Sequence, residues 1–316
     1  MKQFLSVKDA PDVNALIQSA LLYKSSPKRD EDLGRGKRMG LLFLNPSLRT
    51  RLSTQVAANN LGLEVVVFNV GQEGWALEFA DGAIMNGSTV EHVKDAAPVL
   101  GQYFNILGIR TFPGLADRSV DYSEHVIRQF VRYSGVPVIS LESATLHPLQ
   151  SLTDLLTMTE AFREKRKPKV VLTWAPHVKA LPQCVANSFA QWVNAWDQSE
   201  FVITHPEGYE LDATFSGHAR IEYDQTKALE GADFVYVKNW SSYSQYGKIL
   251  PASGNWTMNL SKLGKARAMH CLPVRRNVEL SDEVLDSRQS LVTTQAANRV
   301  WAAQAVLSEI LKSMNA

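Results

Sequence analysis

The sequence predicts an α/β protein of two domains, each with a mostly parallel β-sheet flanked by helices. Short, strongly apolar segments alternate along the chain with segments whose apolar residues recur at helical spacing. This alternation is typical of parallel sheets whose strands are joined by helical crossovers. The alternation starts afresh after Pro168, and a chain of 316 residues is long enough for two domains of about 150 residues each.

The first half of the chain contains apolar segments with the length of buried strands. Amphipathic segments of helical period separate them, and the residues before them read as helices joined by a polar loop. We therefore expect strands at residues 39–45, 63–70, 105–110 and 136–141, and helices after residue 48 and at residues 90–103 and 122–134.

The turn after the first of these strands is the most informative point of the first half. Ser47 ends the turn and is a good candidate for the N-cap of the helix that follows. A helix start offers free backbone N–H groups and the positive end of the helix dipole, which together bind anions. Arg49 and Arg51 follow, and an arginine can hold a phosphate through two parallel hydrogen bonds. Alone, the segment fits a phosphate site and a capped helix with solvated arginines equally well.

Residues 71–91 break the α/β alternation. They are rich in glycine and polar residues, show no clear periodicity, and include Trp75. A connection of this length is more often functional than idle in a compact domain. Trp75 either buries itself within its own domain or reaches into a site, here or in a neighbouring subunit.

Polar side chains follow two further strands of the first half. Arg110 ends a buried strand, while His147 and Gln150 lie at the start of a helix, three residues apart and therefore on one face. Ligands of open parallel sheets bind beyond the carboxyl ends of the strands, so these positions suit a binding site. A lone arginine at a strand end is nevertheless more often structural.

The second half repeats the pattern of strand and helix. Polar loops at residues 175–179 and 240–257 follow two of its strands. We expect strands at residues 169–174, 200–204, 232–237 and 266–269, and helices at residues 182–193, 223–230 and 295–314.

Composition excludes several classes of protein. A net charge of +1 offers no general attraction for nucleic acid or anionic membranes. Two cysteines do not make a disulfide framework or a zinc site, and no apolar run approaches the roughly 20 residues of a membrane span. Neither a G-x-G-x-x-G nor a Walker motif occurs, so neither half reads as a nucleotide site of those types. A cytoplasmic location is expected.

Three motifs, in order along the chain, resemble those of the aspartate and ornithine carbamoyltransferases. Residues 47–51 are similar to the carbamoyl-phosphate motif S-x-R-T-R, and residues 147–150 are similar to H-P-x-Q. Residues 270–273 read H-C-L-P, as in the ornithine branch, where the aspartate branch has H-P-L-P. The order and separations match across nearly the whole chain.

The resemblance implies a fold, an assembly and a set of site residues. Family members have a carbamoyl-phosphate domain, here residues 1–148 joined by the C-terminal helix 295–316, and an amino-acid domain, here residues 149–294. They are homotrimers with active sites shared between subunits, and they require neither cofactor nor metal. Arg110, His147 and Cys271 would be catalytic. The residues expected to bind carbamoyl phosphate are Ser47, Leu48, Arg49, Thr50, Trp75 (from a neighbouring subunit), Arg110, His147, Gln150, Cys271, Leu272 and Arg299.

The loop after residues 232–237 departs from enzymes that use free ornithine. Those enzymes carry an aspartate and a Ser-Met-Gly loop there, and both hold the charged α-ammonium end of the substrate. Here Lys238 follows, which would repel an ammonium group but attract the α-carboxylate of an N-acylated ornithine. Leu48 and the Trp75 loop also resemble the N-acylornithine branch, in which the positions of Glu142, His177 and Lys238 contact the amino-acid substrate.

The acyl group is inferred from a few positions. Acetylornithine enzymes have a glutamate at the position of Val90 and a lysine at that of Glu279, whereas the succinylornithine enzymes have an uncharged proline at the first. Uncharged Val90 would not repel the carboxylate of a succinyl group, and Arg275 could pair with it. We therefore expect N-succinyl-L-ornithine as the acceptor, with N-acetyl-L-ornithine as the alternative and a catalytically silent carbamoyl-phosphate-binding protein as the rival from another class.

Overall fold

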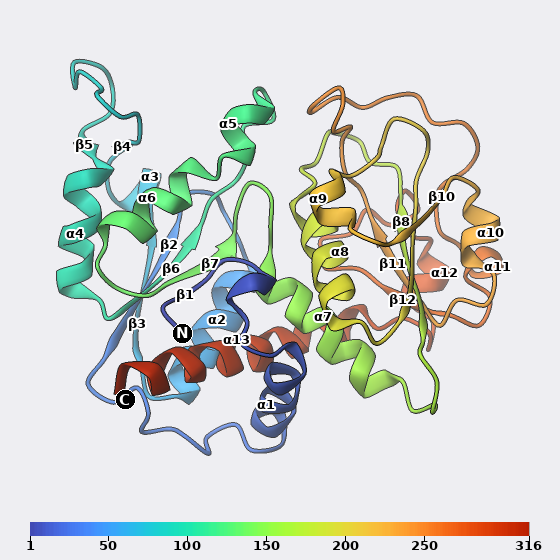
Figure 1. The fold of residues 1–316 in the computed structure, drawn as a ribbon, viewed down its shortest axis with the longest axis horizontal. Coiled ribbons are helices and arrows are strands. Elements are labelled where there is room, and N and C mark those ends of the chain that lie inside the picture. The colour runs from blue at the N-terminus through green and yellow to red at the C-terminus, as the bar shows by residue number, and fades with distance from the viewer. Residues whose placement is uncertain (316) are drawn as a thin grey trace. The chain divides into compact units, whose positions relative to one another are not determined.

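The computed structural model describes residues 1–315. The chain forms two compact units, one made of residues 1–114, 119–149 and those from 299 onward, the other of residues 115–118 and 150–298. Each unit contains a five-stranded parallel sheet with helices packed on it (Figure 1). The predicted α/β fold with two parallel sheets is confirmed.

The sheet of the first unit has the strand order β1-β7-β6-β2-β3. After β2 the chain adds β3 on one side and then β6 and β7 on the other, so the winding reverses between β2 and β6. The strands are β1 (Gln3–Phe4), β2 (Arg38–Phe43), β3 (Glu64–Asn69), β6 (Ile106–Arg110) and β7 (Val138–Glu142). The helices of this part of the chain are α1 (Val13–Ser25), α2 (Arg49–Asn60), α3 (Val70–Glu73), α4 (Val93–Tyr103), α5 (Arg118–Tyr122) and α6 (His125–Tyr133), with a 3₁₀ turn at Val7–Asp9.

The centre of this sheet is apolar on both faces, as expected for a parallel sheet between helices. Two of its glycines also allow close packing. A Cβ atom on Gly40 would lie 2.8 Å from the Phe104 ring, and one on Gly108 would lie 2.8 Å from a methyl carbon of Leu41. The tight packing in turn holds the ends of β2 and β6 in a fixed relation, and these ends carry the site residues.

The sheet of the second unit has the order β10-β9-β8-β11-β12, and its winding reverses between β8 and β11. Its strands are β8 (Lys169–Trp174), β9 (Glu200–Thr204), β10 (Arg220–Glu222), β11 (Phe234–Lys238) and β12 (Arg267–Met269). The helices are α7 (Pro148–Ala161), α8 (Cys184–Trp196), α9 (Ala213–Ser216), α10 (Gln225–Leu229), α11 (Leu260–Leu263), α12 (Asp282–Leu285) and α13 (Val292–Asn315). α7 begins in the first unit, and the C-terminal part of α13 belongs to it.

The C-terminal part of α13 packs on the first unit, as expected. Ser308 accepts a hydrogen bond from the Tyr23 hydroxyl at 2.6 Å, which joins α13 to α1. Gln304 accepts one from the Asn60 amide at 3.0 Å, which joins α13 to α2. These buried contacts hold the helix against the first unit and fix the position of Arg299 within it.

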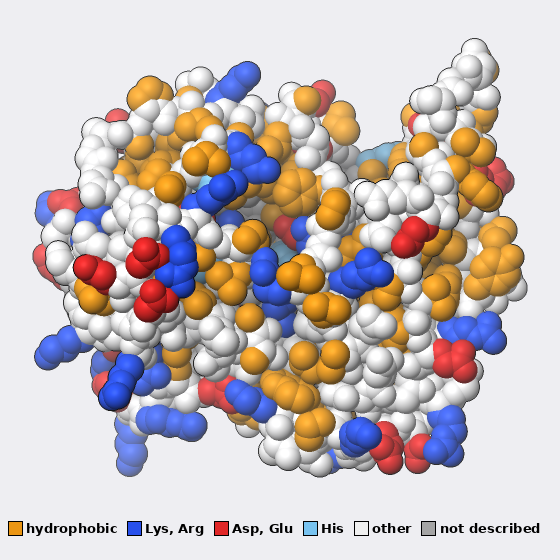
Figure 2. Space-filling model, turned by 180° about the vertical axis from the view of Figure 1, so that it is seen from behind, with side chains coloured by type: hydrophobic (Ala, Val, Ile, Leu, Met, Phe, Trp, Pro, Cys, Tyr) orange, Lys and Arg blue, Asp and Glu red, His pale blue; other side chains and the backbone are white. Residues whose placement is uncertain are grey.

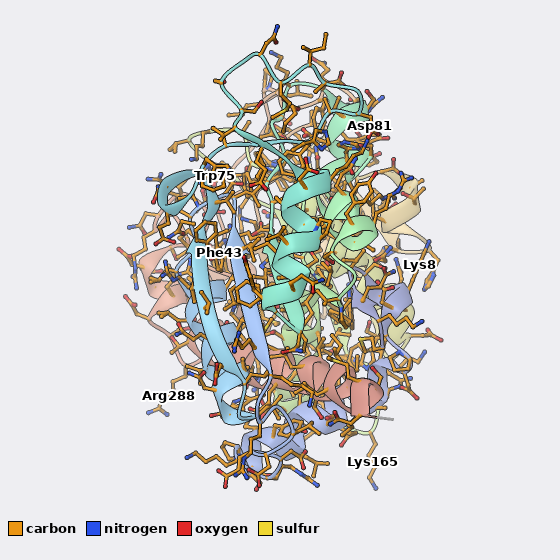
Figure 3. The ribbon with its side chains drawn as sticks, turned by 90° about the vertical axis from the view of Figure 1, so that its left-hand side faces the viewer. Lys8, Phe43, Trp75, Asp81, Lys165 and Arg288 are labelled. Atoms are coloured by element: carbon orange, nitrogen blue, oxygen red, sulfur yellow. The ribbon has the colours of Figure 1, made fainter. Side chains whose placement is uncertain are left out.

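Residues 71–91 contain more structure than the sequence indicated. β4 (Leu77–Glu78) and β5 (Glu91–His92) form a short parallel ladder, and the helix expected from residue 90 begins only at Val93. The loop between β4 and β5 stands out from the surface, at the upper right of Figure 2. Trp75 lies in the segment that follows α3 (Figure 3). Within residues 1–315, no helix combines the length and apolar character that a bilayer crossing requires.

Candidate active site

The start of α2 lies beyond the carboxyl end of β2, where the sheet of the first unit reverses its winding. The prediction that Ser47 caps this helix was wrong. Leu48 is the N-cap residue and provides no side-chain hydrogen bond, while the Ser47 hydroxyl accepts one from Arg110 Nη1 at 3.1 Å. The first backbone N–H groups of α2 therefore lack a side-chain cap, and the dipole end stays available to an anion.

Thr50, in the first turn of α2, is buried and joins two arginines. Its Oγ1 accepts hydrogen bonds from Arg299 Nη2 at 2.6 Å and from Arg110 Nη1 at 3.4 Å. Because both lone pairs of the hydroxyl face guanidinium groups, its proton must point elsewhere and can be donated. Arg49, the first residue of the helix, is partly buried beside it. The helix start thus combines positive charge with hydroxyl and backbone donors.

Arg110 ends β6 and forms an ion pair with Glu142 at the end of the neighbouring strand β7. Arg110 Nη1 lies 2.8 Å from Glu142 Oε2, and both side chains are largely buried. The backbone carbonyl of Arg110 accepts a hydrogen bond from the Leu44 N–H at 3.0 Å, which keeps the ends of β2 and β6 together. Glu142 therefore contacts a residue expected to bind carbamoyl phosphate, although the sequence assigned Glu142 to the acylornithine.

His147, just before α7, is buried with only 4% of its surface exposed. Burial, and then the charges of Arg299 and Arg110, hold the pKa of His147 well below its usual value. The imidazole is consequently neutral near pH 7 and carries one N–H donor. Its Nε2 lies 3.8 Å from Glu142 Oε2. A neutral histidine among arginines suits hydrogen bonding to a carbonyl oxygen better than it suits proton transfer.

Glu124 fixes the loop between Glu142 and His147, a role that no sequence pattern indicated. Its backbone is left-handed, with φ of 53°, which is unusual for a residue other than glycine. Its Oε1 accepts hydrogen bonds from the Ser143 hydroxyl at 2.6 Å, from the Thr145 N–H at 2.8 Å and from the Thr145 hydroxyl. These contacts order the loop that presents His147.

Trp75 and Val90 lie on the exposed segment that contains β4 and β5. Their side chains are 54% and 65% exposed, respectively. In the described part of the chain, the Trp75 indole donates to Glu91 Oε2 at 2.8 Å rather than to any residue at the start of α2. The Val90 N–H donates to the Ala76 carbonyl at 2.9 Å, which keeps the two residues on neighbouring segments.

The second unit places its own site residues at the carboxyl ends of β8, β11 and β12, where that sheet reverses its winding. Lys238 ends β11 and is buried. His177 follows β8 and is partly buried, and its Nδ1 accepts a hydrogen bond from the Lys179 N–H at 3.2 Å. This is the position at which open α/β sheets bind ligands.

The turn after β12 is ordered by His270 and Glu279. His270 Nδ1 accepts from the Leu272 N–H at 2.9 Å, so its proton is on Nε2, which lies 3.3 Å from Glu279 Oε1. Glu279 Oε2 accepts from the Arg275 N–H at 2.8 Å. Burial raises the pKa of Glu279, but His270 and Lys238 outweigh it and lower this pKa to about 2. Leu272 takes a left-handed conformation with φ of 56°, Cys271 is partly buried, and the Arg275 side chain is exposed.

Within the first unit, contacts join most of the site residues that the sequence predicted: Ser47, Thr50, Arg110, Glu142, His147 and Arg299. Within the second unit, Gln150 of α7 is buried and donates to Asp154, one turn further along the helix, at 2.7 Å. The sequence analysis missed Asp154, although its spacing of four residues from Gln150 places both on one helix face.

Comparison with known proteins identifies the family. Residues 2–160 match the aspartate/ornithine carbamoyltransferase carbamoyl-P binding domain, and residues 183–310 match the aspartate/ornithine carbamoyltransferase Asp/Orn binding domain. The chain belongs to the aspartate/ornithine carbamoyltransferase family. The protein is thus a carbamoyltransferase, as the three motifs indicated.

Relatives of this carbamoyltransferase include enzymes named for acylated ornithines. The N-succinylornithine carbamoyltransferase of Bacteroides fragilis (strain 638R) is 49% identical over 99% of this chain and 100% of the relative. The N-acetylornithine carbamoyltransferase of Xanthomonas axonopodis pv. citri (strain 306) is 33% identical over 98% of this chain and 96% of the relative. A solved N-acetyl-L-ornithine transcarbamylase variant, complexed with carbamyl phosphate and N-succinyl-L-norvaline, is 33% identical, with a TM-score of 0.88 over 98% of this chain and 100% of its own.

Proposed function

We propose that this carbamoyltransferase moves the carbamoyl group of carbamoyl phosphate to the δ-amine of N-succinyl-L-ornithine. The products are N-succinyl-L-citrulline and phosphate, and the reaction belongs to arginine biosynthesis. The observation that carries the donor half of the proposal is the start of α2, where a helix without a side-chain cap meets Arg110, Arg299 and the Thr50 hydroxyl.

The phosphate of the donor suits this arrangement. Backbone N–H groups, a hydroxyl that can donate and guanidinium forks are the groups that bind phosphate dianions in proteins. Ser47, Leu48, Arg49 and Thr50 would hold the phosphate, with Trp75 supplied by a neighbouring subunit. Arg299 keeps the Thr50 hydroxyl oriented through its 2.6 Å hydrogen bond.

The transfer step needs positioning and charge stabilisation. The neutral δ-amine attacks the carbonyl carbon, and a C–N bond forms as the carbonyl oxygen gains negative charge. Arg110 and the N–H of neutral His147 would stabilise this oxygen, with Gln150 and the turn at Cys271 and Leu272 orienting the carbamoyl group. The bond from carbon to the phosphate oxygen then breaks, and the proton lost from the nitrogen leaves on the phosphate. Arginines at the start of α2 stabilise the departing dianion.

The acceptor half of the proposal rests on the charges of the residues that are expected to contact the acylated ornithine. Lys238 would pair with the α-carboxylate of an acylated ornithine, and an ammonium end would be repelled there. His177 and Glu142 would complete the contacts to the amino-acid part. Arg275, whose side chain is exposed, would pair with the second carboxylate that only a succinyl group carries.

Val90 supports the choice of the succinyl group. By resemblance, the acetylornithine enzymes carry a glutamate at this position. Solved variants of an N-acetyl-L-ornithine transcarbamylase, with one glutamate replaced by alanine, serine, proline or valine, are each described as complexed with carbamyl phosphate and N-succinyl-L-norvaline. The identity of 49% to an N-succinylornithine enzyme, against 33% to an N-acetylornithine enzyme, points the same way.

A product assay tests the reaction directly. The purified protein is incubated with carbamoyl phosphate and, in turn, ornithine, N-acetylornithine and N-succinylornithine, and ureido product is measured. We expect the highest kcat/KM with N-succinylornithine. A higher kcat/KM with N-acetylornithine would show that N-acetylornithine is the acceptor instead. No product with any of the three would contradict the whole proposal.

Replacing Val90 tests the charge argument. The Val90→Glu substitution places a carboxylate where the succinyl carboxylate is expected, so the preference for succinyl over acetyl substrate should fall about tenfold or more, since like charges at close range cost at least a kcal/mol or so. Val90→Gln is the matched control, with nearly the same size and no charge, and should keep the preference. An unchanged ratio of the two kcat/KM values in Val90→Glu would exclude this role for Val90.

The homotrimer is a further part of the proposal. The exposure of Trp75 and Val90 fits a segment that reaches a neighbouring subunit. Mixing a Trp75→Ala variant with an Arg110→Met variant should restore activity, because mixed assemblies would contain sites with both intact residues. Failure of the mixture to regain activity, in assemblies shown by native mass spectrometry to contain both chains, would contradict shared sites. The cytoplasmic location remains a prediction.

A further inference from the structure

Asp154 is a fully buried carboxylate to which the mechanism above gives no task. It lies on α7 and is 0% exposed. Its Oδ1 accepts two hydrogen bonds, from Gln150 Nε2 at 2.7 Å and from Gln295 Nε2 at 2.6 Å. A buried carboxylate is costly unless its environment supplies strong donors, so its presence here calls for an explanation beyond packing.

The first hydrogen bond fixes the orientation of the Gln150 amide. An amide has a donor end and an acceptor end, and a carboxylate accepts only. Because Nε2 of Gln150 faces Asp154, its Oε1 is the end turned away from Asp154. That end accepts hydrogen bonds and is therefore matched to an N–H donor such as the amide group of carbamoyl phosphate.

The second hydrogen bond orients the Gln295 amide in the same way, with its donor end towards Asp154 and its acceptor end towards the turn after β12. Gln295 gives its Nε2 to Asp154, and its Oε1 accepts from the His270 N–H at 3.0 Å. The backbone at His270 leads directly into Cys271 and Leu272. Asp154 thus determines the direction of an unbroken chain of hydrogen bonds from α7 through α13 to this turn.

Tyr236 of β11 adds a third neighbour. Its hydroxyl lies beside both Asp154 and Cys271, and burial, followed by the charges of these two groups, raises the pKa of Tyr236 well above its usual value. The hydroxyl therefore stays protonated. All of these residues belong to the second unit.

We propose that Asp154 is a positioning residue, which orients the Gln150 amide and, through Gln295, the His270–Leu272 turn so that both present hydrogen-bonding groups of the correct polarity to the carbamoyl group. This inference rests on the proposed function, because that function makes Gln150, Cys271 and Leu272 ligands of carbamoyl phosphate. Asp154 itself touches no substrate in this account.

The first test replaces Asp154 with leucine, which keeps most of the shape and offers no acceptor. Both glutamines then lose the oxygen to which they donate, and their amides can turn. We expect kcat/KM for carbamoyl phosphate to fall about 10- to 100-fold, the usual effect of losing a hydrogen bond to a charged group. Because Asp154 acts partly through Gln150, Asp154→Leu should cost less in a Gln150→Ala background than in the wild type.

The conservative variant separates positioning from simple packing. Asp154→Asn keeps an oxygen at Oδ1, which can still accept from both Gln150 and Gln295 and so holds both amides in the same orientation. Only the charge and the second carboxylate oxygen are lost. We expect Asp154→Asn to keep most of the kcat/KM that Asp154→Leu loses.

Glu160→Gln is the matched control on the same two helices. Glu160 accepts from the Asn298 amide at 2.7 Å, so this contact also joins α7 to α13 but reaches neither Gln150 nor His270. It should leave KM for carbamoyl phosphate and kcat within about twofold of wild type, since it touches none of the ligands. Urea unfolding of each variant reports stability separately.

Three results would overturn the inference: Asp154→Leu within threefold of wild type, equal costs of Asp154→Leu with and without Gln150, or a folded Asp154→Asn as slow as Asp154→Leu. If Asp154→Leu does not fold, Gln295→Leu decides, because it breaks the link from Asp154 to the His270 N–H. A Gln295→Leu variant within threefold of wild type would overturn the inference, and one that also fails to fold would show that these residues serve folding, against the proposal. The proposed function fails separately, if the wild type makes no ureido product while all variants fold.

Discussion

The two sheets share the order of four strands, β3-β2-β6-β7 in one and β9-β8-β11-β12 in the other, but differ in the charge that they carry at their carboxyl ends. In the first unit, Arg110 and Arg299 meet the dipole end of α2, with Glu142 as the paired carboxylate. In the second unit, the charges of Lys238 and Arg275 are balanced by the carboxylates of Glu279 and Asp154, and the amides of Gln150 and Gln295 hold Asp154. One architecture therefore supplies a strongly positive edge in one unit and a neutral, finely oriented edge in the other.

This difference shows how two sheets of the same α/β class can recognise chemically different groups. A phosphate is recognised mainly by charge, which a helix start and arginines provide. The carbamoyl group carries little charge, so the orientation of donors and acceptors decides its recognition, whereas Lys238 and Arg275 are proposed to pair with the carboxylates of the acceptor. Function thus lies in the few residues at the strand ends rather than in the sheets themselves.

The largest effect should come from removing charge at the positive edge. Arg110→Met removes the ion pair to buried Glu142 and a donor to Ser47 and Thr50. We expect kcat/KM for carbamoyl phosphate to fall about 100- to 1000-fold, because losing one preorganised donor to a developing oxyanion usually costs about this much. Steady-state kinetics measure this, with exposed Arg128→Met of α6 as the control. Arg110→Lys keeps the charge without the fork, and full activity in it would contradict the role of bidentate geometry.

A smaller effect on the other substrate is expected from the neutral edge. Lys238→Met should raise KM for N-succinylornithine about 10- to 100-fold, as a charged hydrogen bond contributes about 1.5–3 kcal/mol, and should leave KM for carbamoyl phosphate unchanged. The comparison would fail if both KM values rose together. Lys265→Met, a surface lysine of the same unit, is the control and should alter neither value.

The smallest effect concerns acid stability. His147 has a folded pKa well below 6.5, so the unfolded chain binds the proton first as the pH falls. Its contribution to stability is complete above pH 6.5 and is lost as the pH falls from there towards the folded pKa, by at most about 1.4 kcal/mol per pH unit. His147→Gln should therefore flatten the fall in urea-unfolding midpoint below pH 6.5. The pKa of His205, in the second unit, is lowered as well. If the unfolding midpoint of His147→Gln falls with pH as steeply as that of the wild type, the pH dependence comes from His205 rather than from His147.

The sequence predicted both sheets because their strands are continuous apolar segments with helical segments between them. It missed β1, β4, β5 and β10, since strands of two or three residues carry no periodic signal. The start of α2 was predicted as an anion site, but the Ser47 cap was wrong because a residue 63 positions away, Arg110, takes the serine hydroxyl. No sequence pattern announces such a tertiary contact.

The residues that hold the candidate site residues in place could not be predicted from the sequence for the same reason. Glu124 acts on a loop that begins 19 residues later, and Gln295 reaches Asp154 across 141 residues. Only the spacing of Gln150 and Asp154 was visible in the chain, as two polar residues on one face of a helix. Motifs indicated the groups that are proposed to face a ligand, whereas the structure was needed to find what holds those groups in place.

If carbamoyl phosphate binds at the start of α2 as proposed, the missing cap there links the lifetime of the protein to its substrate. A side-chain cap at a helix start stabilises the folded state by about 1 kcal/mol, and α2 lacks this stabilisation when no anion is bound. A bound anion would supply that interaction and stabilise the folded chain further in proportion to its concentration. Protein without bound carbamoyl phosphate should therefore unfold more often, and be degraded faster by proteases, than protein with carbamoyl phosphate bound. The supply of the donor would then set the amount of enzyme as well as its rate.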